Sequence, residues 1–223
     1  MVAVVDICNA ALSHLGDRAT VTSIDPPEGS PQAEHCARFY PMARDALLEL
    51  HEWGFITVRA QLAQVSNIWP EWDYAYAAPD NMINTIAVHN AEVTDDYSTP
   101  IVQGYTPEGV TNTGTGIYST QPYALEYDAL TDTSVILTDV ENAVLRYTQR
   151  ADDPTNFSPL FVSCLSFYLA SYLAGPIIKG DTGMAVAEKM EARALRILKN
   201  ATVSDANDNH FRVQQSTPWI AGR

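Results

Sequence analysis

Hydrophobic residues recur at helical spacing near the N-terminus. Apolar side chains three or four positions apart predict a first helix over residues 4–15. A second, longer apolar stripe predicts a helix over residues 31–50, with Ser30 as its N-cap and a proline in its first turn. Pro41 lies inside that stripe, so we expect a kink or a break near Tyr40.

Two further helices are expected near the C-terminus. Ser158 and the proline after it open an uncharged apolar run that we expect to stop at Gly175-Pro176. A last helix is predicted from Thr182 to Thr202, with charged residues over most of its surface. The apolar stripe expected to face the core of this helix consists of Met184, Ala187, Met190, Ala194, Ile197 and Ala201.

Between the helical segments, apolar and polar residues alternate with a period of two. From Ile56 to Leu62 every second residue is apolar, which is typical of a strand with one buried face. Similar short runs separated by Pro, Gly, Asn and Asp predict a small antiparallel sandwich or barrel. These runs are residues 74–78, 83–89, 101–105, 116–120, 123–127, 135–137 and 143–148.

This order of elements predicts an α+β fold. Residues 1–52 and 155–204 would form one helical bundle from two separate stretches of chain, and residues 53–150 an antiparallel β domain inserted into it. The remaining residues, 205–223, are rich in Asn, Asp, Gln and Ser and are expected to form an extended tail.

Charge is distributed unevenly along the 223 residues. Thirteen Lys and Arg against 27 Asp and Glu give a formal net charge of −14, which repels nucleic-acid phosphates and argues against a sequence-specific DNA or RNA reader. Between Ala60 and Leu145 there are twelve acidic residues and no Lys or Arg. The inserted domain therefore presents either a solvated acidic surface or a face directed at DNA or a basic partner. The candidates for a face directed at DNA or a basic partner are Glu92, Asp95, Asp96, Glu108 and Asp132.

Residues 154–178 contain no charged side chain and are long enough to cross a membrane as a helix. A helix buried in a domain or an oligomer is favoured instead, because there is a Gly-Pro break and no excess of Lys or Arg on either flank. The polar residues Ser163, Ser166, Ser171, Tyr168 and Tyr172 also argue against a membrane span. The start of the chain does not resemble a signal peptide, and its three cysteines match no disulfide or zinc spacing. We therefore expect a protein that folds in the cytoplasm and does not enter a membrane.

The sequence contains no recognisable catalytic, metal or cofactor motif. None of the five histidines has ligand partners at the usual spacing. Asp205, Asn207 and Asn209 imitate the start of a calcium loop, but His210 and Ser216 stand where Gly and Glu are needed. We therefore expect no enzyme activity, no metal and no cofactor.

The aromatic residues suggest contacts of other kinds. Trp53 is expected in the core, whereas Trp69 and Trp72 would either stack on a sugar or form a lid over the β domain. Trp219 lies near the end of a polar tail with little of its own domain to pack against. The tail residues expected to dock on another protein chain are Phe211, Arg212, Trp219 and Ile220.

An ordered series of segments resembles the tail tubular protein A family of short-tailed bacteriophages. The series spans nearly the whole chain, and its specificity comes from the order of the segments, because each one alone is a weak signal. The segments are Ile7 to Gly16, Tyr40 to Leu48, Trp53 to Phe55, Arg59 to Ala63, Trp72 to Pro79, Asp153-Pro154, Phe157 to Phe161, Asp205-Ala206 and Trp219 to Arg223.

The resemblance implies a structural virion protein without catalytic activity. A family member of this kind is a head-to-tail adaptor, a ring of twelve copies that binds the portal protein above and the tail nozzle, a tail tubular protein B-like component, below. Double-stranded DNA passes through the ring without specific binding. The implied location is the tail neck of the virion, after assembly in the host cytoplasm. The alternatives are an enzyme, or a glycan-binding tail module that uses Trp69 and Trp72.

Overall fold

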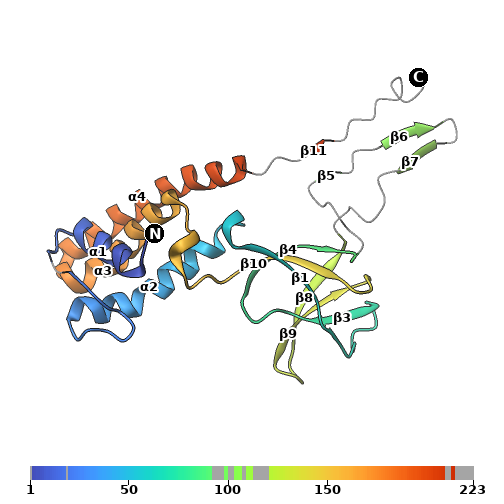
Figure 1. Ribbon diagram of the computed structural model, residues 1–223, viewed down its shortest axis with the longest axis horizontal. Coiled ribbons are helices and arrows are strands. Elements are labelled where there is room, and N and C mark those ends of the chain that lie inside the picture. The colour runs from blue at the N-terminus through green and yellow to red at the C-terminus, as the bar shows by residue number, and fades with distance from the viewer. Residues whose placement is uncertain are drawn as a thin grey trace. The chain divides into compact units, whose positions relative to one another are not determined.

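The computed structural model describes residues 2–18, 20–91, 98–99, 103–106, 109–112, 121–208 and 212–213 (Figure 1). The fold is α+β, as predicted. It forms two compact units, of which the helical unit comprises Met1–Ile56 with Arg150–Asp208. The β unit comprises Thr57–Gln149, and residues 209–223 are grouped with it.

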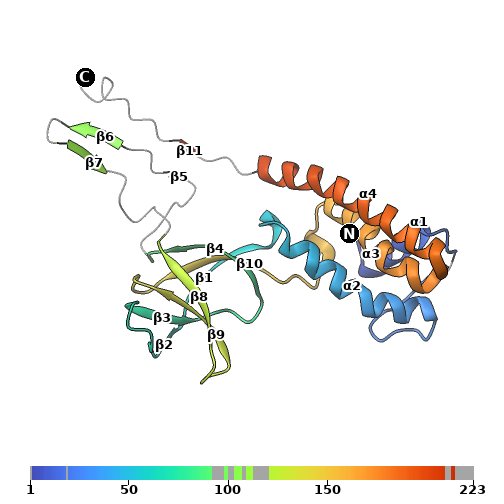
Figure 2. The same ribbon diagram turned by 180° about the vertical axis from the view of Figure 1, so that it is seen from behind.

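The helical unit is built around α3. This helix contacts all three of the others, most extensively α4, and Figures 1 and 2 show it among them. Side chains spaced three or four residues apart along α3, from Phe161 to Leu173, are fully buried. The helices are α1 (Val4–His14), α2 (Pro31–Glu49), α3 (Pro159–Ile178) and α4 (Gly180–Asn207), with short 3₁₀ helices η1 (Gly54–Ile56) and η2 (Pro154–Asn156).

The predicted starts of α1, α2 and α3 are correct, but α3 and α4 continue past their predicted ends, and the alternative of a break in α2 is wrong. The hydroxyl oxygens of Ser30 and Ser158 each accept a backbone N–H at 3.2 Å, as N-caps do. However, α2 runs unbroken through Pro41 and α3 runs unbroken through Pro176. A proline removes one helical hydrogen bond, and at Pro41 the buried neighbours Tyr40 and Ala43 hold the helix together across the gap.

A tight turn joins α3 to α4. Lys179 adopts a φ of +62° and ends α3 after Pro176, so the backbone conformation rather than the proline stops this helix. On α4, a Cβ at Gly183 would lie 3.0 Å from the carbonyl oxygen of Ala174, which explains why the two helices can pack so closely. Gly183 occupies the core position that we predicted for Met184, whose side chain is 67% exposed.

The described strands of the β unit make two larger antiparallel sheets, in the orders β1-β10-β4 and β2-β3-β9-β8. Tyr76 and Ile136 from one sheet share a core with Val88 and Leu145 from the other, which is the packing of a small sandwich. The strands are β1 (Thr57–Gln61), β2 (Gln64–Val65), β3 (Tyr74–Ala77), β4 (Met82–His89), β8 (Tyr123–Asp128), β9 (Thr133–Thr138) and β10 (Val144–Gln149).

Four short strands complete the described part of the β unit. β6 (Gln103–Thr106) pairs antiparallel with β7 (Gly109–Asn112), and β11 (Arg212–Val213) pairs in parallel with β5 (Ser98–Thr99). The strand predicted at 116–120 lies outside the described residues.

Candidate docking surfaces

Aromatic rings of α2 and α3 stack along one side of the helical unit. The ring centroids of His35 and Phe39 are 6.4 Å apart, and those of Phe39 and Tyr172 are 5.9 Å apart. Tyr168 extends the row, with its ring edge toward Tyr172 at 5.4 Å. All four rings are partly exposed.

Exposed apolar residues of α2 continue this surface. Met42 is 54% exposed and Leu50 is 57% exposed, and both lie at helical spacing on the same side of α2 as Phe39. Leu50 ends the apolar stripe predicted over residues 31–50, and its exposure shows that this end of the stripe does not face the core. We call this surface the aromatic face: His35, Phe39, Met42, Leu50, Tyr168 and Tyr172.

The aromatic face is uncharged because of how α2 and α3 are composed. α2 carries one stripe that is buried in the unit and this second stripe beside it, a pattern typical of a helix with more than one partner. α3 has no charged residue along its whole length, although only 44% of its most apolar stretch is buried. The hydrogen bond that joins the hydroxyls of Tyr168 and Tyr172 raises the pKa of Tyr168 to about 12, so this phenol is neutral at physiological pH.

This composition also makes α3, among the described helices, long and apolar enough to cross a membrane. Three helices of the same unit pack against it, as they would against the central helix of a bundle.

Charges on α4 are separated onto two flanks. Glu191 lies close enough to Tyr168 for its negative charge to raise the pKa of that phenol, so Glu191 borders the aromatic face. Arg193 lies on the other side, 4.9 Å above the ring of Phe167, which stacks on His14. We call this other side the basic flank: Lys189, Arg193, Arg196 and Lys199, all exposed and without an ion pair to any described residue.

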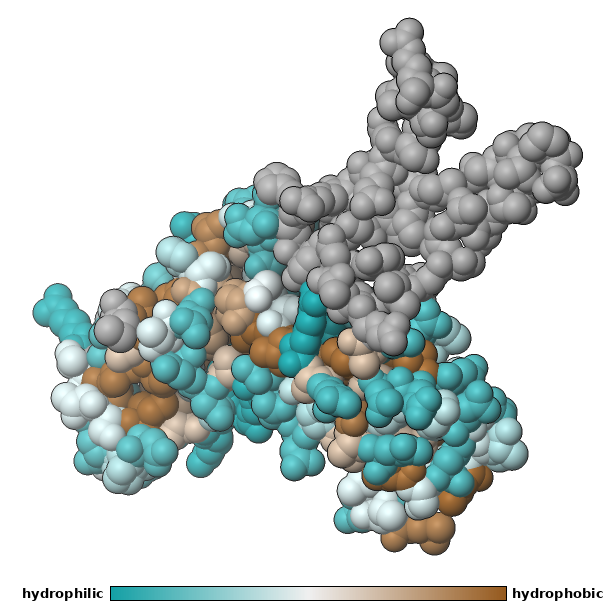
Figure 3. Space-filling view, turned by 45° about the vertical axis from the view of Figure 1, so that its right-hand side comes forward, coloured by the Kyte–Doolittle hydropathy of each residue, from teal (hydrophilic) through white to brown (hydrophobic). Residues whose placement is uncertain are grey.

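The β8–β9 hairpin presents a second apolar surface. Leu130 is 84% exposed, Tyr127 61% and Leu125 49%. We call these three residues the hairpin tip. Hydrophobic side chains are visible in Figure 3 at the lower end of the β unit, where Figure 1 places this hairpin.

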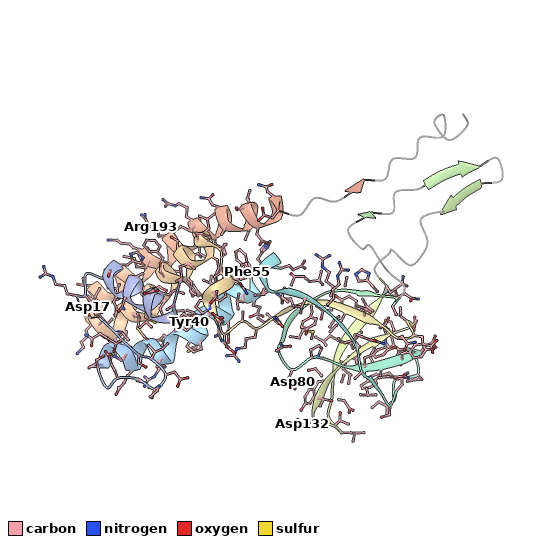
Figure 4. The ribbon with its side chains drawn as sticks, in the orientation of Figure 1. Asp17, Tyr40, Phe55, Asp80, Asp132 and Arg193 are labelled. Carbon is pink, nitrogen blue, oxygen red and sulfur yellow. The ribbon has the colours of Figure 1, made fainter. Side chains whose placement is uncertain are left out.

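The hairpin tip is held in one conformation by hydrogen bonds. The carboxylate of Asp128 accepts the Leu130 N–H at 2.9 Å and the Thr131 hydroxyl at 2.7 Å, and the Thr131 bond lowers the pKa of Asp128. Asp132, labelled in Figure 4, adopts a φ of +55° and accepts a hydrogen bond from the Tyr127 hydroxyl. A turn fixed in this way loses little conformational entropy on binding.

Trp69 and Trp72 pack against the β unit instead of standing out as a platform. Both cover a small cluster formed by Ala75, Val135 and Leu137 on one side of the four-stranded sheet. The Trp72 N–H donates to the Trp69 carbonyl oxygen at 3.3 Å and fixes the loop that carries them. This packing favours the lid interpretation over sugar stacking.

Several residues that carry the family resemblance hold the helical unit together. Arg44 is 4% exposed, and its guanidinium lies 2.7 Å from a carboxylate oxygen of both Asp45 and Asp152. Arg150 approaches the other oxygen of Asp45 at 2.8 Å. This network joins α2 to the segment that follows β10.

The end of α4 is fastened in a similar way. Asp205 accepts the backbone N–H of Gly54 at 3.1 Å and lies 3.0 Å from the ring of His51. Next to them, the indole of Trp53 is fully buried and donates to the Leu47 carbonyl oxygen at 3.0 Å, which confirms its predicted place in the core. Asp205 was expected in an extended tail, but α4 continues to Asn207 and the carboxylate of Asp205 has partners inside the helical unit.

Most of the predicted contact residues lie outside the described part of the chain. Only Asp132 among the acidic candidates is described, and it lies at the hairpin. The backbone of Arg212 lies in β11. Within the described ranges no group of His, Cys, Asp and Glu side chains is arranged to hold a metal ion. The others, Phe211, Trp219, Ile220, Glu92, Asp95, Asp96 and Glu108, are among the residues that the structure does not describe.

Sequence reasoning missed the aromatic face and the hairpin tip. The second apolar stripe of α2 was a detectable signal for the first of these surfaces. Leu125 and Tyr127 alternate with other residues as in any strand, so the sequence did not show that their side of the strand is exposed. The sequence matches no protein-family model and no curated protein.

Proposed function

We propose that this chain is a structural adaptor of a bacteriophage virion that forms a ring, expected to hold twelve copies, between the portal and the tail nozzle. The observation that carries the proposal is an exposed apolar surface on each of the two units: the aromatic face on the helical unit and the hairpin tip on the β unit. A connector needs separate surfaces for separate partners. Contiguous exposed apolar surface in a folded chain marks sites of protein contact.

The resemblance to the tail tubular protein A family supplies the kind of partner. Its segments include Arg44 and Asp205, which hold the helical unit together, so the likeness concerns how the chain is built. The apolar surfaces are separate from those two residues. Apart from Met42, the residues of the two surfaces also lie outside the segments that carry the resemblance, so the surfaces add support that the resemblance alone does not give.

The acidic β unit fits a protein through which DNA passes. If its carboxylates line the channel, they repel phosphates over about one Debye length, roughly 8 Å at physiological salt. DNA then slides through the ring without binding to it. The tail residues Phe211, Arg212, Trp219 and Ile220 are proposed to dock on the portal or on an adjacent copy.

Complementation of tailless particles tests the role. DNA-filled heads made by the virus without this protein are incubated with the purified chain and then with the nozzle protein. The proposal predicts that nozzles attach, and infectivity returns, only when the chain is added first. Heads that bind the nozzle equally well without the chain would refute the adaptor role.

A further inference from the structure

We infer that the aromatic face of one copy packs against the basic flank of α4 in the next copy. This contact deepens the proposed adaptor function and rests on it for the expectation of a ring. Both surfaces belong to the helical unit, so each copy would give one and receive the other.

The aromatic face has an acidic border. Glu49 lies two turns beyond Met42 on the same side of α2. On α4, Glu191 borders the face because its charge acts on Tyr168, whereas Glu188 lies on the side of Ala192 and Lys199. Arg38, one turn before Met42 on α2, is basic and so departs from this acidic border. Glu34 lies one turn before Arg38. The surface as a whole is therefore an apolar centre with an acidic edge.

The basic flank has the complementary composition. Its four cations lie within three turns of α4, with Ala192 and the 61% exposed Val203 on the same side of the helix. Like charges four residues apart, such as Lys189 and Arg193, destabilise a helix by themselves. Carboxylates supplied by another molecule would remove this repulsion.

The chemistry of the flank also suits aromatic partners. Arginine side chains stack on aromatic rings and cover apolar surface with their stems. Arg193 already does so on Phe167 within one copy. Tyr168, Phe39 and their neighbours in the aromatic face offer the same kind of ring to arginines of a neighbour.

Charge separation selects the geometry of the contact. The acidic border and the basic flank lie on different sides of α3, facing Tyr168 and Phe167 respectively. A two-fold contact of the aromatic face with itself would bring acidic border against acidic border. Pairing of unlike surfaces is head-to-tail, and repeated head-to-tail contacts generate a closed ring or a filament.

Mixing two variants tests the contact. The face variant carries Met42→Ser and Leu50→Ser, and the flank variant carries Arg196→Glu; all three side chains are exposed, so both chains should fold. Self-association is followed by sedimentation up to about 1 mM protein. We expect the wild type to associate, more weakly as salt rises. Each variant alone should stay monomeric, and their equimolar mixture should stop at one-to-one dimers, because only one intact pair of surfaces is left.

Matched controls carry the same changes elsewhere. Arg18→Glu reverses an exposed arginine of the same unit, and Ile68→Ser removes a 55% exposed apolar side chain from the β unit, outside both named surfaces. Both controls should associate like the wild type. A monomeric wild type over the whole range, or a mixture that does not dimerise, would overturn the contact.

Two other outcomes separate this inference from neighbouring ideas. If Arg196→Glu weakens binding to duplex DNA but leaves self-association unchanged, the flank is a polyanion site and the inference is wrong. If the mixing pattern holds but the chain fails to restore nozzle attachment, the contact stands and the adaptor function falls. If complementation succeeds with both variants, the function stands and the contact falls.

Discussion

The carboxylate of Asp205, near the end of α4, lies 3.1 Å from the backbone nitrogen of Gly54, in the corner that follows α2. The same carboxylate reaches the ring of His51 at 3.0 Å. One side chain thus ties the last helix to a segment 151 residues earlier in the chain. It closes the helical unit where the chain leaves for the β unit.

Removing this carboxylate should therefore weaken the helical unit. We predict that Asp205→Ala lowers the free energy of unfolding by about 2 kcal/mol, because a hydrogen bond to a charged acceptor contributes about 1.5 to 3 kcal/mol. Urea denaturation measures the change. Glu188→Ala, on an exposed part of the same helix, is the control and should change stability by less than about 0.5 kcal/mol. Equal effects of the two substitutions would show that Asp205 has no special role.

The Arg44 network makes a similar prediction. Arg44→Ala leaves Asp45 and Asp152 without their buried cation and should cost about 2 to 3 kcal/mol. This is less than for a fully buried pair, because the side chain of Asp152 is 81% exposed. Arg150→Ala removes a half-exposed partner and should cost less than about 1 kcal/mol. The reverse order of the two effects would contradict this account.

His14 gives the helical unit a dependence on pH. Burial, and secondly the positive charge of Arg193, lower the pKa of His14 from its usual 6.5. The folded state therefore binds this proton less well than the unfolded state does. The contribution to stability is complete above pH 6.5 and is lost as the pH falls through that value.

Replacing His14 should reduce this dependence. Urea denaturation at pH 7.5 and at pH 5.5, on either side of about 6.5, should give a smaller loss of stability for His14→Gln than for the wild type. Arg193→Gln should reduce the loss less, because burial is the larger cause of the lowered pKa. An unchanged difference between the two pH values in His14→Gln would rule out this role.

The hairpin tip predicts a separation of binding from stability. Leu130→Asp should leave the free energy of unfolding unchanged within about 0.5 kcal/mol, because the side chain is 84% exposed. The same substitution should weaken binding to the portal or nozzle protein at least about tenfold, since burying one leucine contributes about 1.5 to 3 kcal/mol. Ala129→Ser, at the adjacent position, serves as the control for isothermal titration. Full affinity of Leu130→Asp for both proteins would exclude the tip as a docking site.

The tail is expected to act only in assembly. Deletion of Gln214 to Arg223 should abolish ring formation on the portal and leave the circular dichroism spectrum and the unfolding transition intact. Ordering a free segment costs about 1 to 2 kcal/mol per residue, so docking of the tail would wait for a partner surface. Normal rings formed by the truncated chain would refute this expectation.

Local signals in the sequence predicted most of the fold. Ser30 and Ser158 were correct helix starts because an N-cap depends only on residues within one turn. The end of α3 was less predictable, because the positive φ of Lys179 and not Pro176 stops this helix. The unbroken course of α2 depends on packing of Tyr40 and Ala43, which outweighs the hydrogen bond lost at Pro41.

Surfaces and long-range contacts were harder to predict. Leu50 and Met184 continue apolar stripes, yet both are more than half exposed, because helical spacing cannot say how far the neighbouring helices reach. The contact between Asp205 and Gly54 joins residues far apart in the chain and leaves no periodic signal. The aromatic face required the arrangement of α2 beside α3 to become visible.

The most direct test of the adaptor proposal is the mass of the complex between this chain and the portal ring of the same virus. Native mass spectrometry of the mixture should give one discrete species that contains one copy of the chain for each portal subunit. The same measurement with Leu125→Ser and Leu130→Ser shows which partner the hairpin tip binds. Loss of the complex with the portal assigns the tip to the portal, and an unchanged complex assigns it to the nozzle. Portal rings that keep their own mass beside a free monomer would contradict the adaptor function.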